Sequence, residues 1–253
     1  SYNKNIFIEL KFSNITLRIN GIGTKYVFSN SRSDFHSESY PNAVYINGNK
    51  QEDVINSYYF NETDNIVELV WNNTIDNCHH LFYKCSDIKE IDFSNFETSE
   101  CTSMKSMFFG CISLTSLNLS YFDISRVTLL GHMFYNCLSL TSLNLSNFDT
   151  LNITSMEKMF SSCSSLTSLN LSNFNTSNIT SMEKMFYDCK NLEYINLQNF
   201  EENNLTAFND MFINVPDNVV ICINEEKTQN KIFPQIKNKS CYNIDCSNNW
   251  KSG

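Results

Sequence analysis

Residues that interrupt regular structure are scarce: the 253 residues include 6 glycines and 3 prolines. Basic residues are outnumbered, 18 against 27 acidic ones, which gives a formal net charge of −9. Such a balance disfavours binding to the phosphates of nucleic acids or to anionic lipids, so neither is expected as a partner. No apolar run approaches the ~18 residues that cross a bilayer. Membrane attachment is therefore expected only through an anchor outside this sequence.

Common catalytic signatures are also missing. The sequence has no Gly-x-Ser-x-Gly, no phosphate-binding loop and no His-Glu-x-x-His. Cys78-His79-His80 and Cys85 superficially suggest zinc, but no second pair at zinc spacing accompanies them. We expect both histidines to be solvated. The sequence thus predicts no enzyme, no metal site and no cofactor, with an unrecognised pair of glycosidase carboxylates as the remaining enzymatic alternative.

What the chain does have is a repeat. The pair Met-Phe stands at 107–108, 133–134, 159–160, 185–186 and 211–212, and each step is 26 residues. Leu81-Phe82 precedes the series in the same frame, and cysteines follow at Cys85, Cys111, Cys137, Cys163 and Cys189. Units of this kind cannot bury an apolar face alone, so they stack on one another. We expect a stacked array over residues 65–215.

Each unit combines two local patterns. Leu143 and Leu145 alternate with polar residues, which predicts a short strand. A stripe at i, i+3, i+4 and i+7 follows and predicts a short helix; it consists of Met156, Met159, Phe160 and Cys163. Thr154 and Glu157 read as a capping box for that helix, and the same cap column holds Asp76, Thr102, Thr128, Thr180 and Thr206. The predicted class is α/β, with one short parallel strand and one short helix per repeat.

The segment LTSLNLSNFDT at 140–150, followed by Met-x-x-Met-Phe-x-x-Cys, resembles the repeat of BspA-like leucine-rich-repeat surface proteins. The resemblance covers roughly residues 65–215. It implies a right-handed leucine-rich-repeat solenoid, an extracellular location, and a role in adhesion or recognition. It supplies no catalytic residue and no ligand.

The flanks differ from the repeat. Residues 1–64 contain strand-like segments at 6–12, 15–19, 26–28, 44–46 and 58–60, with turn signals at Asn20-Gly21 and Asn47-Gly48. They predict an antiparallel β-rich unit that caps the first repeat; the alternative is that this unit is itself a binding module. Residues 216–253 are expected to form a C-terminal cap, with a closing strand at 219–223, and the start of a cysteine-containing segment.

The cysteines fall into two groups. Those of the repeat column are expected to be buried thiols, although a metal array or a row of disulfides is the alternative. Cys78 and Cys101 stand where Met or a branched apolar residue is usual, and they can pair with each other. Outside the ladder the best disulfide candidates are Cys222, Cys241 and Cys246, with the pairing open. Three cysteines leave one over, which suggests a cysteine-bearing continuation.

The outward positions of the strands form the most distinctive predicted surface. Its candidate binding residues are Glu90, Asp92, Ser116, Asn118, Ser142, Asn144, Ser168, Asn170, Tyr194 and Asn196. The middle is a uniform Ser/Asn face, whereas hot spots favour Tyr, Trp and Arg. Recognition is therefore expected at the ends of the ladder or in the N-terminal unit. The equally weighted alternative is that the ladder residues are only solvated and bind nothing.

Sequons for N-glycosylation are frequent. Seven are candidate sites away from the ladder: Asn14, Asn61, Asn72, Asn152, Asn178, Asn204 and Asn238. Asn175 is another, and glycans on Asn118, Asn144 and Asn170 would cover the ladder itself.

Two functions follow as hypotheses. The first is an extracellular, cell-surface ectodomain that binds a protein or a glycan partner, as an adhesin or a receptor. The second is a structural spacer or coat component that self-associates. A water-ordering array is disfavoured because no regular Thr-x-Thr motif recurs.

Overall fold

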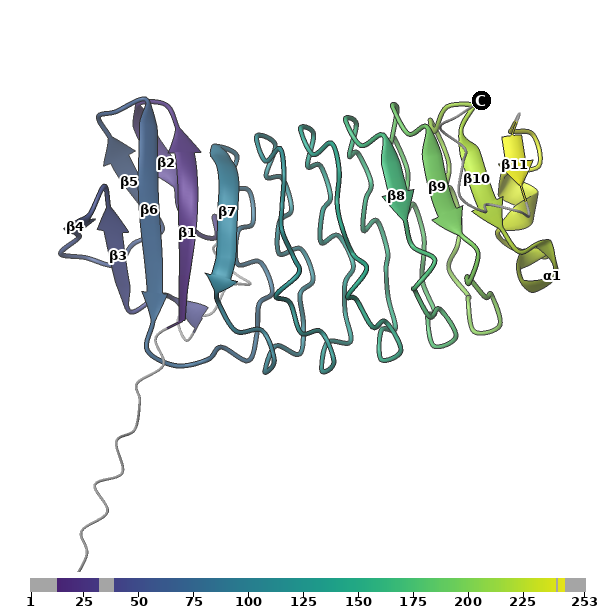
Figure 1. The fold of residues 1–253 in the computed structure, drawn as a ribbon, viewed down its shortest axis with the longest axis horizontal. Helices are drawn as coiled ribbons and strands as arrows, with labels where there is room; N and C mark the ends of the chain where they lie inside the picture. The colour runs from purple at the N-terminus through teal and green to yellow at the C-terminus, as the bar shows by residue number, and fades with distance from the viewer. Residues whose placement is uncertain (1–12, 32–38, 240, 244–253) are drawn as a thin grey trace, which may run out of the picture.

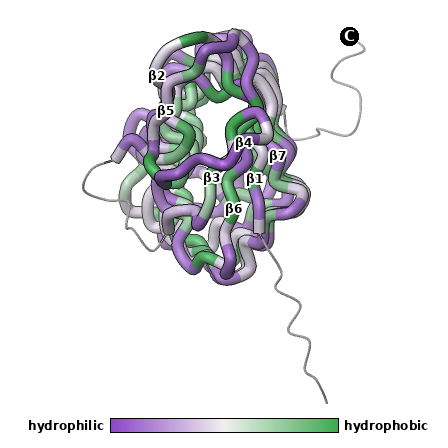
Figure 2. The backbone as a smooth tube through the Cα atoms, turned by 90° about the vertical axis from the view of Figure 1, so that its left-hand side faces the viewer, coloured by the Kyte–Doolittle hydropathy of each residue, from purple (hydrophilic) through white to green (hydrophobic). Residues whose placement is uncertain are grey.

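In the computed structural model the chain forms an elongated row of coils with an antiparallel sheet at one end (Figure 1). The structure describes residues 13–31 and 39–239, and the backbone of 241–243. Seen along the row, successive coils superpose behind the N-terminal strands (Figure 2). The core therefore runs the length of the row.

The N-terminal sheet has the strand order β4-β3-β6-β1-β7. Its members are β1 (Ser13–Asn20), β3 (Ala43–Ile46), β4 (Asn49–Lys50), β6 (Asp64–Trp71) and β7 (Ile88–Asn95). A second, two-stranded sheet pairs β2 (Gly23–Tyr26) with β5 (Ser57–Phe60). Alternate residues of β1, namely Ile15, Leu17 and Ile19, are fully buried, because one face of the sheet is turned toward the core.

Strand β1 joins this sheet to the row of coils. It pairs antiparallel with β6 on one side and with β7 on the other. The expected boundary between residues 64 and 65 falls at the start of β6, a strand of the N-terminal sheet. That sheet extends without a break into β7, the strand of the first coil, so the two parts share one hydrogen-bonded surface.

The two turn signals have different outcomes. Asn47 and Gly48 both have positive φ, 49° and 82°, and connect β3 to β4 as a two-residue hairpin. The hairpin expected at Asn20-Gly21 is wrong, because β1 and β2 lie in different sheets. There Gly21 (φ 89°) lets the chain leave one sheet for the other. The strand expected at 6–12 lies outside the described residues.

Stacked side chains form the core of the coils, as the period predicts. The rings of successive phenylalanines are near-parallel, with centroids 5.5–5.9 Å apart, along the column Phe82, Phe108, Phe134, Phe160, Phe186 and Phe212. The cysteine column is buried as free thiols, which confirms that prediction. From Cys111 onward each thiol donates to a carbonyl of the preceding coil, for example Cys163 to Phe134 O at 3.0 Å. Burial raises the pKa of these thiols, that of Cys189 to about 12.

The expected helices are absent from the described coils, and this prediction is wrong. Residues 156–163 form consecutive turns, with Met159 N donating to Met156 O and Cys163 N to Phe160 O. Between these bonds, the N–H of Lys158 and of Phe160 donates to the next coil. Lys158 (φ 52°) and Ser162 (φ 62°) are left-handed, which an α-helix excludes. The side chains of the stripe are buried as predicted, but turns and not a helix place them in the core.

The predicted capping boxes are also wrong. The hydroxyl of Thr154 donates to Thr128 O at 3.3 Å, and that of Thr180 to Thr154 O at 3.1 Å. The backbone N–H of each threonine donates to the same carbonyl. The threonine column therefore links coils to one another and caps no helix.

The repeat strands are shorter than expected in the middle of the row. A parallel sheet of β8 (Ser168–Asn170), β9 (Tyr194–Leu197), β10 (Val220–Ile223) and β11 (Cys241–Asn243) occupies the C-terminal end. Residues 114–119 and 140–145 form no strand, and bonds such as Thr141 N to Thr115 O connect them.

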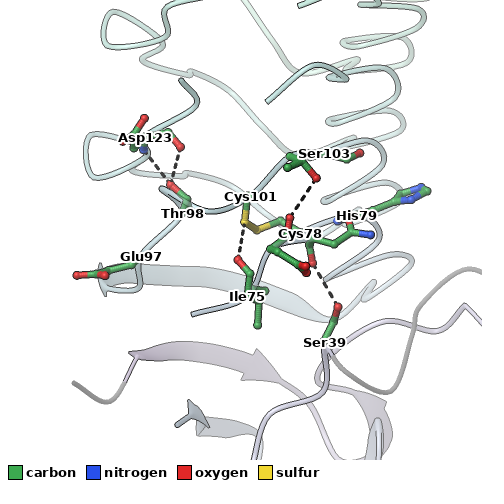
Figure 3. The surroundings of a disulfide bond; sticks show 12 residues. Ser39, Ile75, Cys78, His79, Glu97, Thr98, Cys101, Ser103 and Asp123 are labelled. Carbon is green, nitrogen blue, oxygen red and sulfur yellow. Dashed lines mark hydrogen bonds between the residues drawn. A yellow bond between two sulfur atoms is a disulfide. The ribbon is translucent and has the colours of Figure 1, made fainter. Parts of the chain in front are cut away.

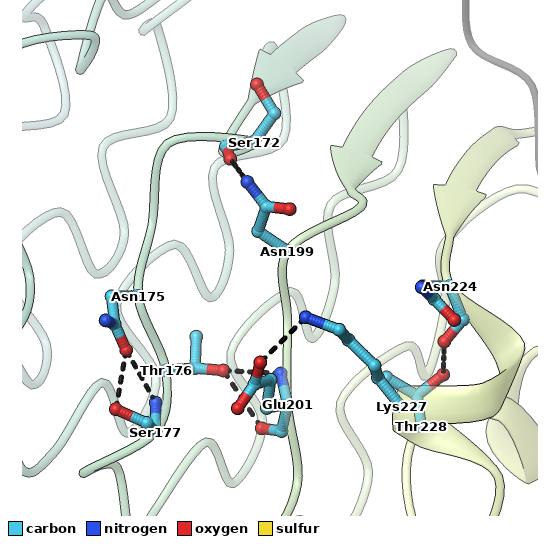
Figure 4. A network of polar contacts seen from close by, with 9 residues as sticks. All are labelled: Ser172, Asn175, Thr176, Ser177, Asn199, Glu201, Asn224, Lys227 and Thr228. Atoms are coloured by element: carbon cyan, nitrogen blue, oxygen red, sulfur yellow. Dashed lines mark hydrogen bonds and ion pairs between the residues drawn. The ribbon is translucent and has the colours of Figure 1, made fainter.

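The C-terminal end closes on two short helical turns, α1 (Glu225–Thr228) and η2 (Phe233–Gln235). The carboxylate of Glu202 is buried and accepts backbone N–H groups from Asn230, Lys231 and Ile232 at 2.7–3.1 Å. Lys227 reaches from α1 to Glu201, one coil back, at 2.7 Å (Figure 4). Polar contacts thus fasten the closing segment to the last coils.

Candidate binding site

A disulfide joins the first two coils next to the N-terminal sheet. Cys78 and Cys101 are bonded to each other, which confirms the pairing suggested by their positions in the repeat. Both are fully buried, and Cys78 N donates to Ser103 O in the next coil. Glu97, Thr98 and Asp123 lie on one side of this bond, and His79 on the other (Figure 3). The disulfide fixes the segment from which the candidate site is built.

That site is a groove of about 580 Å³ where β1 and β7 meet the first two coils. Its lining contains five hydroxyl residues, two amides, two carboxylates and two aromatic rings. They are Ser13, Asn14, Thr74, Ser94, Asn95, Phe96, Glu97, Thr98, Ser99, Tyr121 and Asp123. The volume lies in the range of small-ligand sites, about 300–1,000 Å³.

Two hydroxyls hold the walls of the groove in place. Ser13 Oγ donates to Asn95 O (3.4 Å) and accepts the N–H of Glu97 (3.2 Å). Thr98 Oγ1 donates to Asp123 O (3.0 Å) and accepts the N–H of Asp123 (2.8 Å). Each hydroxyl thereby ties together two segments that are distant in sequence.

The groove carries negative charge. Hydrogen bonds from Ser125, first its backbone N–H and then its hydroxyl, hold the pKa of Asp123 below its usual value, so this carboxylate is ionised at neutral pH. Lys, Arg and His do not occur among the lining residues. The nearby Arg126 is paired with Glu100. Among the described residues, the lining therefore offers hydroxyl, amide and carboxylate groups and no basic side chain.

Tyr121 is the exposed aromatic residue of the groove, with 56% of its surface accessible. It interrupts a column of asparagines that reads Asn95, Tyr121, Asn147, Asn173, Asn199. Asn147 Nδ2 donates to Leu119 O and Phe122 O in the preceding coil, both at 3.0 Å, and Asn173 does the same one coil on. A tyrosine cannot form these bonds. This break in the column is the signal in the sequence that could have located the groove.

The predicted strand-face ladder is mostly exposed but is already engaged by its own backbone. Asn118, Asn144 and Asn170 each accept the N–H of the residue two positions later, at 3.0–3.1 Å. Asp92 does the same for Ser94. These local turns use one side-chain oxygen of each residue. Ser94 and Asn95, at the end of the strand that carries Glu90 and Asp92, line the groove.

At the C-terminal end the ladder prediction is wrong. Tyr194 and Asn196 are buried, at 7% and 6% exposure. The parallel strand β10 lies in register beside them, and Cys222 Sγ lies 3.6 Å from the Tyr194 hydroxyl. At the other end Glu90 is exposed but lies 3.7 Å from Arg18, which forms a two-bond ion pair with Asp64.

The remaining predicted positions are distributed along the surface. Asn14 is half-buried and donates to Glu68, whereas the other sequon asparagines are exposed. Asn152, Asn178 and Asn204 each donate to a carbonyl of the preceding coil. The side chains of Cys241 and Cys246 lie outside the described residues, so the pairing of Cys222 stays a prediction.

The expectation of solvated histidines is wrong for His80, which is 8% exposed. Its left-handed backbone (φ 61°) packs the ring against Tyr83, with centroids 4.6 Å apart. Among the described residues no group of three His, Cys, Asp or Glu is placed to hold a metal ion. Over the same residues, no helix is long and apolar enough to cross a membrane.

Comparison with known sequences identifies the family. Residues 55–144 and 139–218 match the family described as "Mycoplasma protein of unknown function, DUF285". The chain belongs to this DUF285 family. Among solved structures, a leucine-rich repeat protein from Bacteroides ovatus ATCC 8483 aligns at 13% identity over 79% of this chain and 78% of its own, with a TM-score of 0.22. No curated protein matches.

Proposed function

We propose that this DUF285 protein is an extracellular, cell-surface ectodomain for recognition or adhesion, and that it binds its partner in the groove between the N-terminal sheet and the first two coils. The groove is the observation that carries the proposal. It is the place where the regular contacts between coils are interrupted, and side chains there are left available for a ligand. The proposed role is binding and not catalysis.

Two further features support this role. The repeat is proposed to be of the BspA-like leucine-rich type and to wind as a right-handed solenoid, a type associated with surface proteins. The disulfide Cys78–Cys101 fits an oxidising compartment, because cytosolic thiols are normally kept reduced. Any membrane attachment would lie outside this sequence.

Labelling intact cells tests the location. An impermeant amine reagent is expected to modify the native protein on living cells as strongly as in a lysate. Protection on intact cells would refute the location. For recognition, the immobilised chain is expected to retain cells or cell-wall fragments, and a Ser99→Trp variant, which fills the groove, to retain fewer. Equal retention by both would move binding away from the groove.

A structural spacer that self-associates is the second candidate. Exposed apolar side chains on the N-terminal unit favour it, namely Ile22, Ile55, Tyr59 and Ile66, at 48–66% exposure. Light scattering after size-exclusion chromatography separates the two. A monomer that retains a heterologous partner supports recognition, whereas concentration-dependent assembly without a partner supports the spacer.

A further inference from the structure

We propose that the groove around Tyr121 binds a short neutral oligosaccharide. This inference rests on the proposed function and adds the chemical class of the ligand. Four features of the groove support it: the exposed ring of Tyr121, polar side chains without hydrogen bonds among the described residues, walls held by hydrogen bonds, and negative charge.

The exposed ring of Tyr121 offers a stacking surface. One face of a pyranose ring is formed largely by C–H groups, and a flat aromatic side chain binds such a face while its polar end stays in water. Tyr121, 56% exposed, replaces an asparagine that elsewhere closes the space between coils. The same substitution therefore opens the groove and supplies the ring beside it.

Polar side chains around this ring remain available. Within the described part of the chain, the side chains of Thr74, Ser94, Asn95 and Ser99 form no hydrogen bond. Hydroxyls and amides both donate and accept, which matches the mixed character of sugar hydroxyls. The Asp123 carboxylate already accepts from Ser125, and its remaining lone pairs can accept from a sugar hydroxyl. The lining thus matches a ligand that is rich in O–H groups and also has an apolar face.

The walls are held before any ligand arrives. Thr98 bridges to both backbone groups of Asp123, and Ser13 ties β1 to the segment after β7. Because these contacts already fix the backbone, binding orders few further groups, and this lowers its entropic cost. A weakly binding, strongly hydrated ligand such as a sugar gains most from such a site.

Charge selects among possible ligands. The ionised Asp123 lines the groove, and among the described residues no basic side chain lines it. Sialylated or sulfated glycans would be repelled, whereas neutral ones would not. A basic peptide would also be attracted, but one exposed ring in a polar groove offers little of the apolar contact that peptide sites use. A neutral glycan is therefore the ligand that fits best.

The test is a glycan array probed with the full chain, followed by titration of the strongest binder. The key variant is Tyr121→Asn, which removes the ring and restores the asparagine column, so its fold is expected to be kept or strengthened. Tyr59→Ala is the matched control, since Tyr59 is 66% exposed on β5 and does not line the groove. The array is expected to show neutral oligosaccharides, with at least ~10-fold weaker binding for Tyr121→Asn, about 1.4 kcal/mol, and unchanged binding for Tyr59→Ala.

Several results would overturn the inference. They are binding confined to anionic glycans, salt-sensitive capture of Lys/Arg peptides at Tyr121, equal losses in both variants, or an empty array. If cells are still retained by the chain in any of these cases, the proposed function stands and only the ligand class is wrong. Loss of surface labelling and of cell retention would instead refute the proposed function.

Discussion

Replacing Ser162 by glycine tests the turns that stand where helices were expected. Ser162 has φ 62° and donates its N–H to Tyr187 O at 2.7 Å. Side chains with a Cβ are strained in this left-handed conformation, and glycine is not. The hydroxyl of Ser162 forms no hydrogen bond among the described residues, so the substitution removes little besides the strain.

The expected free-energy change has two opposing parts. Releasing a left-handed residue from its Cβ strain stabilises the fold by about 1–2 kcal/mol. The extra freedom of glycine in the unfolded chain opposes this by about 0.5–1 kcal/mol. The net gain is about 0.5–1 kcal/mol, which raises Tm by roughly 1–4 °C for a chain of this size. In a helix the same change would destabilise, since glycine is a poorer helix former than serine.

Urea and thermal unfolding of Ser162→Gly provide the measurement. Ser165→Gly is the matched control, because Ser165 is three residues away and is not left-handed. We expect the unfolding midpoint to rise for the first variant and to fall for the second. If the unfolding midpoints of both variants fall by similar amounts, the turn geometry is refuted and a helix is the better description of this segment.

Three other predictions address the ends and the middle of the row. Replacing Cys78 by Met and Cys101 by Val removes the disulfide that closes a loop with a sequence separation of 23. The loss should lower the free energy of unfolding by about 3 kcal/mol. A reductant should lower the unfolding midpoint of the wild type more than that of the variant. Glu202→Gln removes the negative charge that accepts the N–H of Lys231 and of its neighbours. This should destabilise the C-terminal end by about 2 kcal/mol and raise hydrogen exchange over residues 225–239. Unchanged exchange there would contradict the prediction. Burial lowers the pKa of His132 below 6.5, and the nearby Glu157 opposes this shift only in part. Between the folded-state and unfolded-state pKa values, the unfolded chain therefore binds more protons than the folded one. Stability should therefore be full above about pH 6.5 and fall as the pH drops through the folded-state pKa, a loss that His132→Gln should reduce.

The burial pattern of the coils could be predicted from the sequence, whereas their backbone could not. Stacked identical units must place the same side chain at the same depth, so the columns of Phe160 and Cys163 follow from the period alone. A stripe at i, i+3, i+4 and i+7 is buried equally well by a helix or by successive turns. The discriminating signal was the column of Gly110, Asn136 and Asp188, residue types that tolerate positive φ.

The candidate site was only partly accessible to the same reasoning. Alternation along the strands located the outward face, but it could not show that Asn144 accepts the N–H of Ser146. Nor could it show that β10 pairs beside Tyr194 at the C-terminal end. Both depend on how the chain closes on itself, which a repeat pattern does not encode. The expectation that recognition lies at the ends or in the N-terminal unit stays a prediction.

A physical reason connects irregularity with binding in this fold. In the regular coils many polar side chains bond to a neighbouring coil, as when Thr150 Oγ1 bonds to both backbone groups of Asn175. Coils that satisfy one another leave few groups for a ligand. Where Tyr121 replaces an asparagine, the link to the preceding coil is lost, and side chains such as Ser99 stay unpaired among the described residues. The regular column therefore provides length and rigidity, and the capacity to bind is expected where a column is broken.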